Sequence, residues 1–280
     1  MGIARRSMVA TAAGNGFLAI DLNPLPMRIS SSSTTHRTRT ASIGWVVDVQ
    51  NDFMLKALPG GRLYVHELSN PDDAGAEQII PNLSRAVALL QATCDQVTYT
   101  GDWHHKDDPE IDPATPNPAD GTYPPHCMGM SDDPIERAGA ALIPEVQPAH
   151  DPVILARDVV GDEAREVAYE AVKGRRSTFI QKHQFSVFTG APGVEAYLDG
   201  LAEALDAELE IVMCGVATDV CVKHALDGFL SRNYRIIVLK DAIYGLGLEA
   251  EAALFTAWEE GGVEMLTTEE YLARQSRFRN

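Results

Sequence analysis

Short apolar runs alternate with stretches of helical periodicity along the chain from Ser42 onward. The first run, at residues 43–49, is apolar until it ends in acidic and amide residues, which indicates a buried strand of a parallel sheet, and the other runs indicate further strands. Together the runs cover residues 43–49, 96–100, 153–156, 178–180, 210–214, 235–239 and 263–266, and those at 153–156 and 178–180 are short candidates. Apolar residues at helical spacing predict helices at residues 77–94, 194–205, 219–231 and 249–260, a further helix at 163–173, and a terminal helix with Thr268 as its N-cap.

This alternation predicts one α/β domain over residues 43–280, with three α/β/α layers and a mostly parallel sheet of about six strands. Ligands of such sheets bind beyond the carboxyl ends of the strands. Four residues of reactive type lie at or beyond the carboxyl ends of predicted strands, namely Asp48, Asp102, Lys182 and Cys221. We therefore expect their side chains to meet at one edge of the sheet.

Residues 1–42 differ from the rest of the chain. They carry five arginines against one aspartate and a Ser/Thr-rich stretch at residues 30–35, without clear periodicity. This composition resembles that of an organelle transit peptide, but an over-long start or a disordered extension explains it equally well. We exclude this N-terminal extension from the predicted fold.

The net charge and the cysteine content limit the kinds of binding partner and the cellular compartment that we expect. The net charge of −17 disfavours nucleic acid and anionic membrane surfaces, and the chain has no apolar run of the ~18 residues that a membrane span requires. Four cysteines in 280 residues are too few for a disulfide scaffold, so a reducing compartment is the default. We expect a cytoplasmic protein, with organelle targeting by residues 1–42 left open.

Cys221 is the candidate nucleophile. The apolar run 209–213 breaks at Gly215 and turns into a predicted helix, which places Cys221 near the first helical turn. Free amides and the positive end of the helix dipole favour a thiolate there and offer donors to an oxyanion. The alternative is a cysteine packed as a small hydrophobic residue.

Asp48 and Lys182 are candidates for supporting groups. An aspartate at a buried strand end requires a partner or a function, and burial raises its pKa toward that of a base. Lys182 follows the run 178–180 and could stabilise a thiolate or hold Asp48 by charge. A solvated turn aspartate and an ordinary surface lysine are the alternatives.

Asp102 and His104 predict a metal site. Residues two apart at a strand end point the same way, so this carboxylate and this imidazole can bind one ion. His126 is available as a third ligand across a long, proline-rich loop, and such loops are usually functional. An Asp-x-His pair is weak evidence by itself. His105 would point to the opposite side and is left out.

These residues lie in motifs that resemble those of the isochorismatase-like cysteine hydrolases, and among them the nicotinamidase/pyrazinamidase branch. The matching pieces, in family order, are Asp48–Phe53, Gly60-Gly61 with Leu63 and Val65, Asp102-Trp103-His104, Pro124-Pro125-His126-Cys127, Gly139-Ala140 with Pro144, Lys182 with Phe185-Ser186-Val187-Phe188, and Gly215–Cys221. They cover roughly residues 43–266. The resemblance implies a Rossmann-like fold.

The resemblance also implies roles for site residues. Asp48, Lys182 and Cys221 would form a catalytic triad, and a cis bond between Val216 and Ala217 would lie beside an oxyanion hole made of the Ala217 and Cys221 amides. The metal ligands would be Asp102, His104 and His126, holding a divalent ion (zinc, or else iron or manganese) that binds the ring nitrogen of a pyridine. The aromatic residues that would sandwich this ring are Phe53, Tyr123 and Phe185.

The chain departs from the family pattern in several places. Between Lys182 and Phe185 it is shorter than in many nicotinamidases and resembles the metal-free branches. Tyr123 stands where a tryptophan is common, and Glu110 is a possible fourth metal ligand in a loosely aligned loop. The segment 151–177 is longer than expected, lies directly before Lys182 and could reshape the pocket.

Three functional hypotheses follow. The first is a metal-dependent amidase that converts nicotinamide to nicotinate and ammonia through a cysteine thioester. The second keeps the cysteine hydrolase but changes the substrate to another small amide or carbamoyl compound, with the ion structural or absent. The third is a non-enzymatic binding protein, which the intact set Asp48, Lys182 and Cys221 disfavours. The expected partner is a small-molecule carboxamide, and we expect a homo-oligomer.

Overall fold

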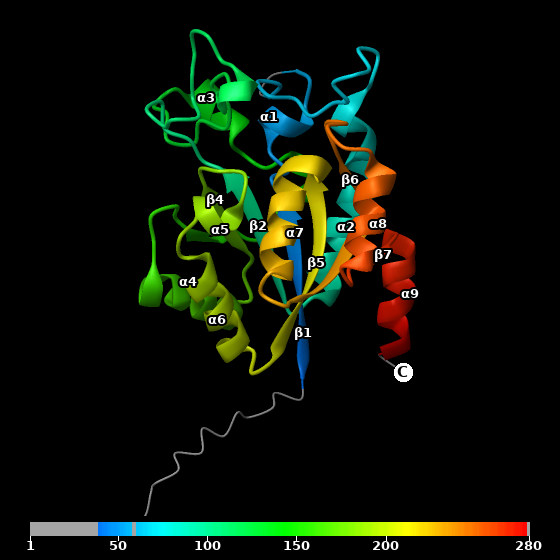
Figure 1. Cartoon of the computed structure of the whole chain (residues 1–280). Coiled ribbons are helices and arrows are strands. Elements are labelled where there is room, and N and C mark those ends of the chain that lie inside the picture. The colour runs from blue at the N-terminus through cyan, green and yellow to red at the C-terminus, as the bar shows by residue number, and fades with distance from the viewer. Residues whose placement is uncertain (1–38, 58–59, 279–280) are drawn as a thin grey trace, which may run out of the picture. The chain divides into compact units, whose positions relative to one another are not determined.

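The structure, a computed structural model, describes residues 39–57 and 60–278 (Figure 1). The described residues form a seven-stranded sheet in the order β3-β4-β2-β1-β5-β6-β7, and every neighbouring pair of these strands is parallel. The strands are β1 (Thr40–Val47), β2 (Gln96–Asp102), β3 (Val153–Leu155), β4 (Thr178–Lys182), β5 (Glu208–Val216), β6 (Arg235–Tyr244) and β7 (Glu264–Leu266). The predicted fold class is confirmed, with seven strands instead of about six.

Helices cover both faces of this sheet (Figure 1). The longer ones are α2 (Ile80–Thr93), α4 (Gly161–Gly174), α6 (Val194–Ala204), α7 (Lys223–Leu230), α8 (Glu251–Glu260) and α9 (Thr268–Phe278). The short ones are α1 (Asn51–Met54), α3 (Pro134–Gly139), α5 (Val187–Gly190), the 3₁₀ turns η1 (Gly75–Ile79), η2 (Pro118–Asp120) and η3 (Pro144–Val146), and the π-helical turn η4 (Thr218–Val222).

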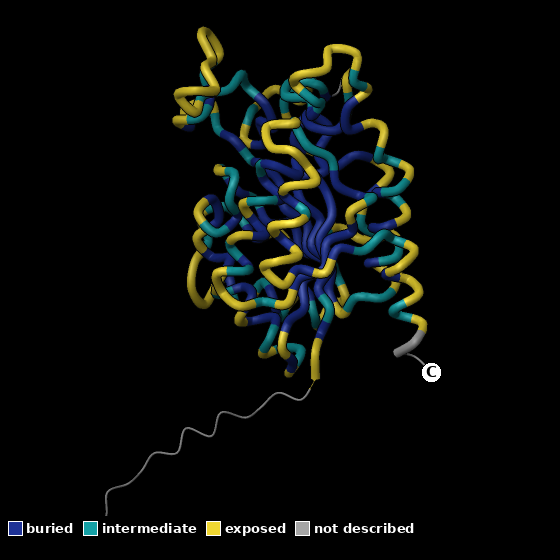
Figure 2. Tube along the Cα trace, turned by 45° about the vertical axis from the view of Figure 1, so that its right-hand side comes forward, coloured by how far each residue is buried: buried dark blue, intermediate teal, exposed yellow. Residues whose placement is uncertain are grey.

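The two faces of β1 show how the sheet divides the core. Ile43, Trp45 and Val47 point to a cluster that includes the buried sides of α4, α6, α7 and α8. Val46 points to the opposite cluster, which includes α2 and the aromatic ring of Tyr271 from α9. Both sets are almost fully buried, which explains why the strand is continuously apolar in sequence. Figure 2 shows this buried interior along the strands, with exposed residues on the outer surface of the helices.

Most predicted elements are present with shifted ends. β1 begins at Thr40 instead of residue 43, and α4 confirms the helix predicted at 163–173. The predicted N-cap Thr268 is one residue late, because Thr267 forms a capping box with Glu270: each side chain accepts a hydrogen bond from the other residue's backbone N–H. Residues 1–38 of the proposed N-terminal extension lie outside the described residues, whereas residues 40–42 belong to β1.

The strand order reverses direction at β1. From β1 the chain moves to β2 and β4 on one side, and it later returns through β5, β6 and β7 on the other. Crevices at such a switch point, outside the carboxyl ends of the strands, are where parallel sheets bind ligands. The ends of β1, β2 and β5 are the places where Asp48, Asp102 and the segment leading to Cys221 lie.

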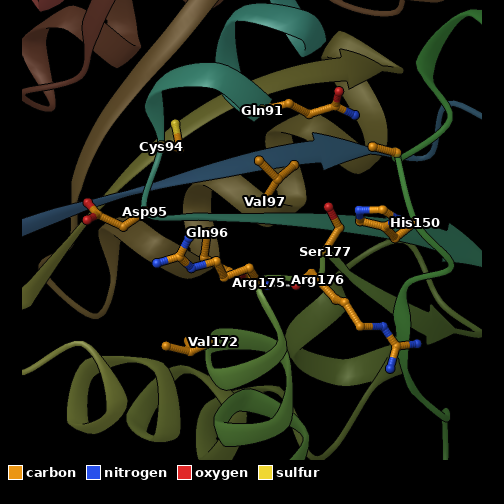
Figure 3. Close-up of a pocket in the computed structure, with 11 residues that line it drawn as sticks. Gln91, Cys94, Asp95, Gln96, Val97, His150, Val172, Arg175, Arg176 and Ser177 are labelled. Atoms are coloured by element: carbon orange, nitrogen blue, oxygen red, sulfur yellow. Dashed lines mark hydrogen bonds between the residues drawn. The ribbon is translucent and has the colours of Figure 1, made fainter.

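The opposite ends of the strands carry a smaller cavity of about 330 Å³ (Figure 3). It is lined where β2 and β4 begin, by Gln96, Val97 and Ser177 among others, and the Arg176 side chain points away from the Arg175 side chain. None of the residues predicted for the site lines it. Within the described residues, no helix is both long and apolar enough to cross a membrane.

A substitution at Gly215 tests how closely β5 packs against β1. Its φ of 122° is disfavoured for L side chains, and an added Cβ would lie 2.0 Å from the carbonyl oxygen of Val47. We expect Gly215→Ala to destabilise the protein by about 3 kcal/mol, lowering Tm by roughly 6–12 °C in a thermal melt. Gly174→Ala is the matched control, since its Cβ would make only an ordinary 3.4 Å contact. A Gly215→Ala protein that melts like the control would contradict this packing argument.

Candidate active site

Asp48 follows the last residue of β1 and is completely buried. Its φ of 50° lies in the left-handed region, which is uncommon for a residue other than glycine. The backbone N–H donates to the Thr100 carbonyl (3.2 Å), and the Thr100 hydroxyl donates to Oδ1 of Asp48 (2.7 Å). These bonds to β2 fix the carboxylate, so Asp48 is not a solvated turn residue.

Lys182 is the last residue of β4, and only 1% of its surface is exposed. Its Nζ lies 2.9 Å from Oδ2 of Asp48, contacts Oδ1 of Asp102, and lies 3.8 Å from Sγ of Cys221. It also donates to the carbonyl of Gln184 at 3.1 Å. The ammonium group therefore touches both predicted acids and the predicted nucleophile, and it is not a surface lysine.

Cys221 lies in η4, just after β5, and is 7% exposed. The peptide bond between Val216 and Ala217 is cis, as the resemblance implied. The carbonyl of Ala217 accepts hydrogen bonds from the N–H groups of Val220 and Val222, which holds the start of the turn. Ala217 and Cys221, whose amides form the predicted oxyanion hole, both line the large cavity described below.

Burial controls the protonation of this cluster. It raises the pKa of Asp48 despite the opposing charge of Lys182, and it raises the pKa of the Cys221 thiol well above its usual value. The pKa of Lys182 rises in spite of burial, because Asp102 and Asp48 stabilise its charge. Burial of Cys221 therefore opposes the thiolate that its position in the helical turn favours, and the charge of Lys182 acts in the other direction.

Four side chains converge beside the triad. One ligand atom from each of Asp102, His104, Glu110 and His126 lies within 4.8 Å of all the others. Nε2 of His104 is 3.8 Å from both Oδ2 of Asp102 and Oε1 of Glu110, and Nε2 of His126 is 3.8 Å and 3.6 Å from the same two atoms. The structure brings together the three predicted metal ligands and the possible fourth one.

The donor set fits a divalent cation. Both Nε2 atoms are buried and form no hydrogen bond with any described residue, whereas the Nδ1 atoms are engaged. Nδ1 of His104 lies 3.3 Å from Asp108, and Nδ1 of His126 lies 2.8 Å from the Pro124 carbonyl. Contacts of this kind orient metal-binding imidazoles. Burial and the neighbouring His104 lower the pKa of His126 to about 4, which keeps it neutral as a ligand must be.

Two residues missed by the sequence analysis support this group. Arg157 donates two nearly parallel hydrogen bonds to Asp108, at 2.7 and 2.8 Å, and a third to the Trp103 carbonyl at 2.9 Å. These bonds lower the pKa of Asp108 against the effect of burial. Arg157 comes from the long segment 151–177. The only sequence signal was the position of Asp108, four residues after His104.

Gln50 is a third residue that sequence reasoning did not single out. Its amide oxygen accepts from the N–H of Asp102 (2.8 Å), and its amide nitrogen donates to the carbonyls of Asp102 and Ala140, each at 2.8 Å. The side chain is fully buried. It thereby ties the end of β2 to the segment that carries Asp48.

A cavity of about 760 Å³ opens onto both clusters. Asp102, His126, Ala217 and Cys221 lie in its wall together with the three predicted aromatic residues, Phe53, Tyr123 and Phe185. The Tyr123 ring lies 5.8 Å from that of Phe185 and 6.2 Å from that of His126, and Phe53 lies 5.7 Å from His126. His105, which was not predicted as a metal ligand, is 40% exposed and pairs with Asp107. The three aromatic residues and His126 therefore form one continuous aromatic part of the cavity wall.

The chain is similar to several known proteins. The chain is similar to the nicotinamidase of Escherichia coli (strain K12), with 25% identity over 236 residues that cover 79% of this chain and 92% of the relative. It is similar in fold to N-carbamoylsarcosine amidase from Thermoplasma acidophilum, with a TM-score of 0.51, 22% identity, and coverage of 81% of this chain and 96% of the other. It is also similar to PnC1 from L. infantum, solved in complex with nicotinate, with a TM-score of 0.54, 21% identity, and coverage of 82% and 93%.

The model of the isochorismatase domain matches residues 43–270, which contain every strand except the first residues of β1, and all the site residues named above. The chain therefore belongs to the isochorismatase family of hydrolases.

Proposed function

We propose that the protein is a metal-dependent amidase that hydrolyses nicotinamide to nicotinate and ammonia through a thioester on Cys221. The observation that carries the proposal is the buried contact of Lys182 with Asp48, Asp102 and Cys221, directly beside the group of four metal-type ligands. An acid, a thiol and a candidate ion site in one aromatic-lined cavity suit a planar carboxamide. Similarity to a nicotinamidase and to a protein solved with nicotinate supports this substrate.

Acylation begins with proton transfer from the Cys221 thiol to Asp48. The sulfur attacks the carboxamide carbon, and the negative oxygen of the tetrahedral intermediate accepts hydrogen bonds from the backbone amides of Ala217 and Cys221. Asp48 returns the proton to the leaving nitrogen, so ammonia departs and a thioester remains. Lys182 stays protonated and stabilises the developing thiolate at 3.8 Å.

Deacylation repeats these steps with water. Asp48 removes a proton from a water molecule, the hydroxyl adds to the thioester carbon, and the same amides bind the oxyanion. The carbon–sulfur bond then breaks, and the sulfur regains a proton from Asp48. One water is consumed per cycle, and one carboxylic acid and one ammonia are released, which together become a carboxylate and an ammonium ion at neutral pH.

Asp102, His104, Glu110 and His126 are the residues that would hold the ion. Two imidazoles and two carboxylates suit zinc, and also iron or manganese. When bound, the ion supplies a Lewis acid that holds the pyridine nitrogen. Phe53, Tyr123 and Phe185 then orient the ring so that its carboxamide faces Cys221.

A second candidate keeps the same chemistry and changes the substrate to another small amide or a carbamoyl compound. The similarity in fold to an N-carbamoylsarcosine amidase favours it. A panel of carboxamides and carbamoyl compounds, assayed for ammonia release with and without a chelator, separates the two. All four cysteines are free, and we propose a cytoplasmic location for the activity. A homo-oligomer and a targeting role for residues 1–42 stay predictions.

The nucleophile is tested by Cys221→Ala. We expect this variant to lose at least about a thousandfold in kcat while still binding the substrate, because it removes the attacking atom and little volume. Ammonia release measures the first effect, and calorimetric titration with nicotinamide measures the second. Cys214→Ala, another buried cysteine seven residues upstream in β5, is the control and should keep its activity. Turnover by Cys221→Ala within about tenfold of the control would place the nucleophile elsewhere.

The ion site is tested through Arg157, which touches none of the four proposed ligands. Arg157→Leu should weaken zinc binding by about 10–100-fold. Without Arg157, Asp108 is no longer held in place, so its contact no longer orients the His104 ring. The metal content after dialysis against a graded chelator measures this loss. Arg165→Leu is the control from the same segment, since Arg165 forms exposed pairs with Asp199 and Glu203. Equal metal retention in both variants argues against this support.

The proton acceptor is tested by pH. Asp48 must be ionised to accept the thiol proton, and burial raises its pKa. Activity is therefore lost as pH falls through this raised value, and kcat/KM should rise along an acidic limb that lies above the usual aspartate range of about 3.5–4. The midpoint belongs to the coupled Asp48, Lys182 and Cys221 group. A flat kcat/KM between pH ~4 and ~8, with the fold intact by circular dichroism, is the outcome that excludes Asp48.

A further inference from the structure

The cavity is much larger than the substrate proposed above. Its volume of about 760 Å³ lies in the upper part of the range, about 300–1,000 Å³, in which pockets enclose drug-sized ligands. A single pyridine ring with a carboxamide would occupy only the end next to Cys221 and His126. The remaining part therefore has room for a further group attached to the ring.

Burial distinguishes an inner end from an outer chamber. At the inner end, Asp102 and His126 are at most 2% exposed. The outer chamber, which we define as Tyr64, Leu68, Pro71, Leu246 and Leu248, lies in the same wall. Leu68 and Leu248 are each 59% exposed, so this part opens to solvent. Adjacent apolar side chains left exposed at the mouth of a cavity are typical of a binding surface.

The outer chamber is held in place by bonds to the catalytic segment. Both oxygens of Asp219, two residues before Cys221, accept backbone hydrogen bonds, from Leu246 at 2.8 Å and from Leu248 at 2.7 Å. The N–H of Leu68 donates to the Leu246 carbonyl at 2.9 Å. The two leucine-bearing loops therefore pack on each other and on the turn that carries the nucleophile. The wall is formed before a ligand arrives.

The charged side chains near this chamber already have partners. Nζ of Lys56 donates to the Asp73 carbonyl at 3.1 Å and lies 5.5 Å above the Tyr64 ring. The carboxylate of Asp73 accepts from the Tyr244 hydroxyl at 2.8 Å and from the Glu67 N–H at 2.8 Å. Arg62, which pairs with Asp52, and His66, whose ring stacks on that of Tyr64, lie in the same wall. The rest of the outer chamber offers leucine, proline and tyrosine carbon. This composition favours an apolar group over a phosphate or a carboxylate.

We propose that the site acts on primary carboxamides whose ring carries an apolar extension, such as a second aromatic ring, which lies against the outer chamber. The inference rests on the proposed amidase function and narrows its substrate class. The inner end holds the carboxamide, and Leu68, Leu246 and Leu248 cover the extension. Burial of that extension and of the exposed leucines supplies binding free energy that nicotinamide itself does not provide.

Nicotinamide, 5-phenylnicotinamide and 6-phenylnicotinamide are the probes, assayed for ammonia release with the zinc-loaded full chain. We expect at least one phenyl compound to exceed nicotinamide about tenfold or more in kcat/KM, which corresponds to burial of one aromatic ring. Hydrolysis of nicotinamide, with neither phenyl compound reaching about a tenfold higher kcat/KM, overturns this inference and leaves the proposed function standing. No hydrolysis of any of the three rejects the proposed function itself.

Leu248→Asp tests the location of the extension. It should lower kcat/KM for the preferred phenyl compound about tenfold more than kcat/KM for nicotinamide, so that the ratio of the two falls. The control is Leu272→Asp, an exposed leucine on α9 that does not line the cavity, and it should leave the ratio unchanged. Equal ratios in the two variants overturn the inference. So does a dimer that Leu248→Asp alone dissociates in sedimentation, because the leucines would then cover a second copy of the chain.

Discussion

The buried ammonium group of Lys182 is the interaction on which the site depends. It is shared by Asp48 and Asp102, and it lies 3.8 Å from the sulfur of Cys221. Removing one partner from a buried group of charges typically costs about 3–5 kcal/mol, because the others remain uncompensated. One cation thus keeps two carboxylates in the interior. It also connects the proposed proton acceptor with the first of the candidate metal ligands, so the two clusters form one electrostatic unit.

The parallel sheet makes this unit possible. Its central strands end side by side, and the strand order reverses at β1, which leaves a crevice between the segments that follow β1 and β5. Each buried group in the crevice is held by its neighbours: Thr100 binds Asp48, and Gln50 binds both backbone groups of Asp102. Preorganised dipoles of this kind lower the cost of charge development during a reaction.

The sequence predicted the parts of the site that depend on strand ends. Asp48, Asp102 and Lys182 could be placed because apolar runs stop just before or at them, and parallel strands bring their ends to one edge. The π-helical turn at Cys221 and the raised pKa of its thiol could not be predicted, because both depend on how deeply that turn is buried. Arg157 was missed for another reason. Its partner Asp108 lies 49 residues earlier in the chain. No local sequence pattern links an arginine to a loop aspartate at that distance.

The inner and outer parts of the cavity are built from different kinds of structure. The inner groups are fixed at strand ends by buried hydrogen bonds, whereas the outer chamber consists of loops that Asp219 ties to the catalytic turn. Loops tolerate changes in side chains better than buried strand ends, because fewer of their groups require a specific partner. A change at Leu68 or Leu248 therefore alters the surface offered to a substrate without moving Lys182 or its acids. Under the proposed function, this separation would let the same thiol chemistry act on carboxamides of different size.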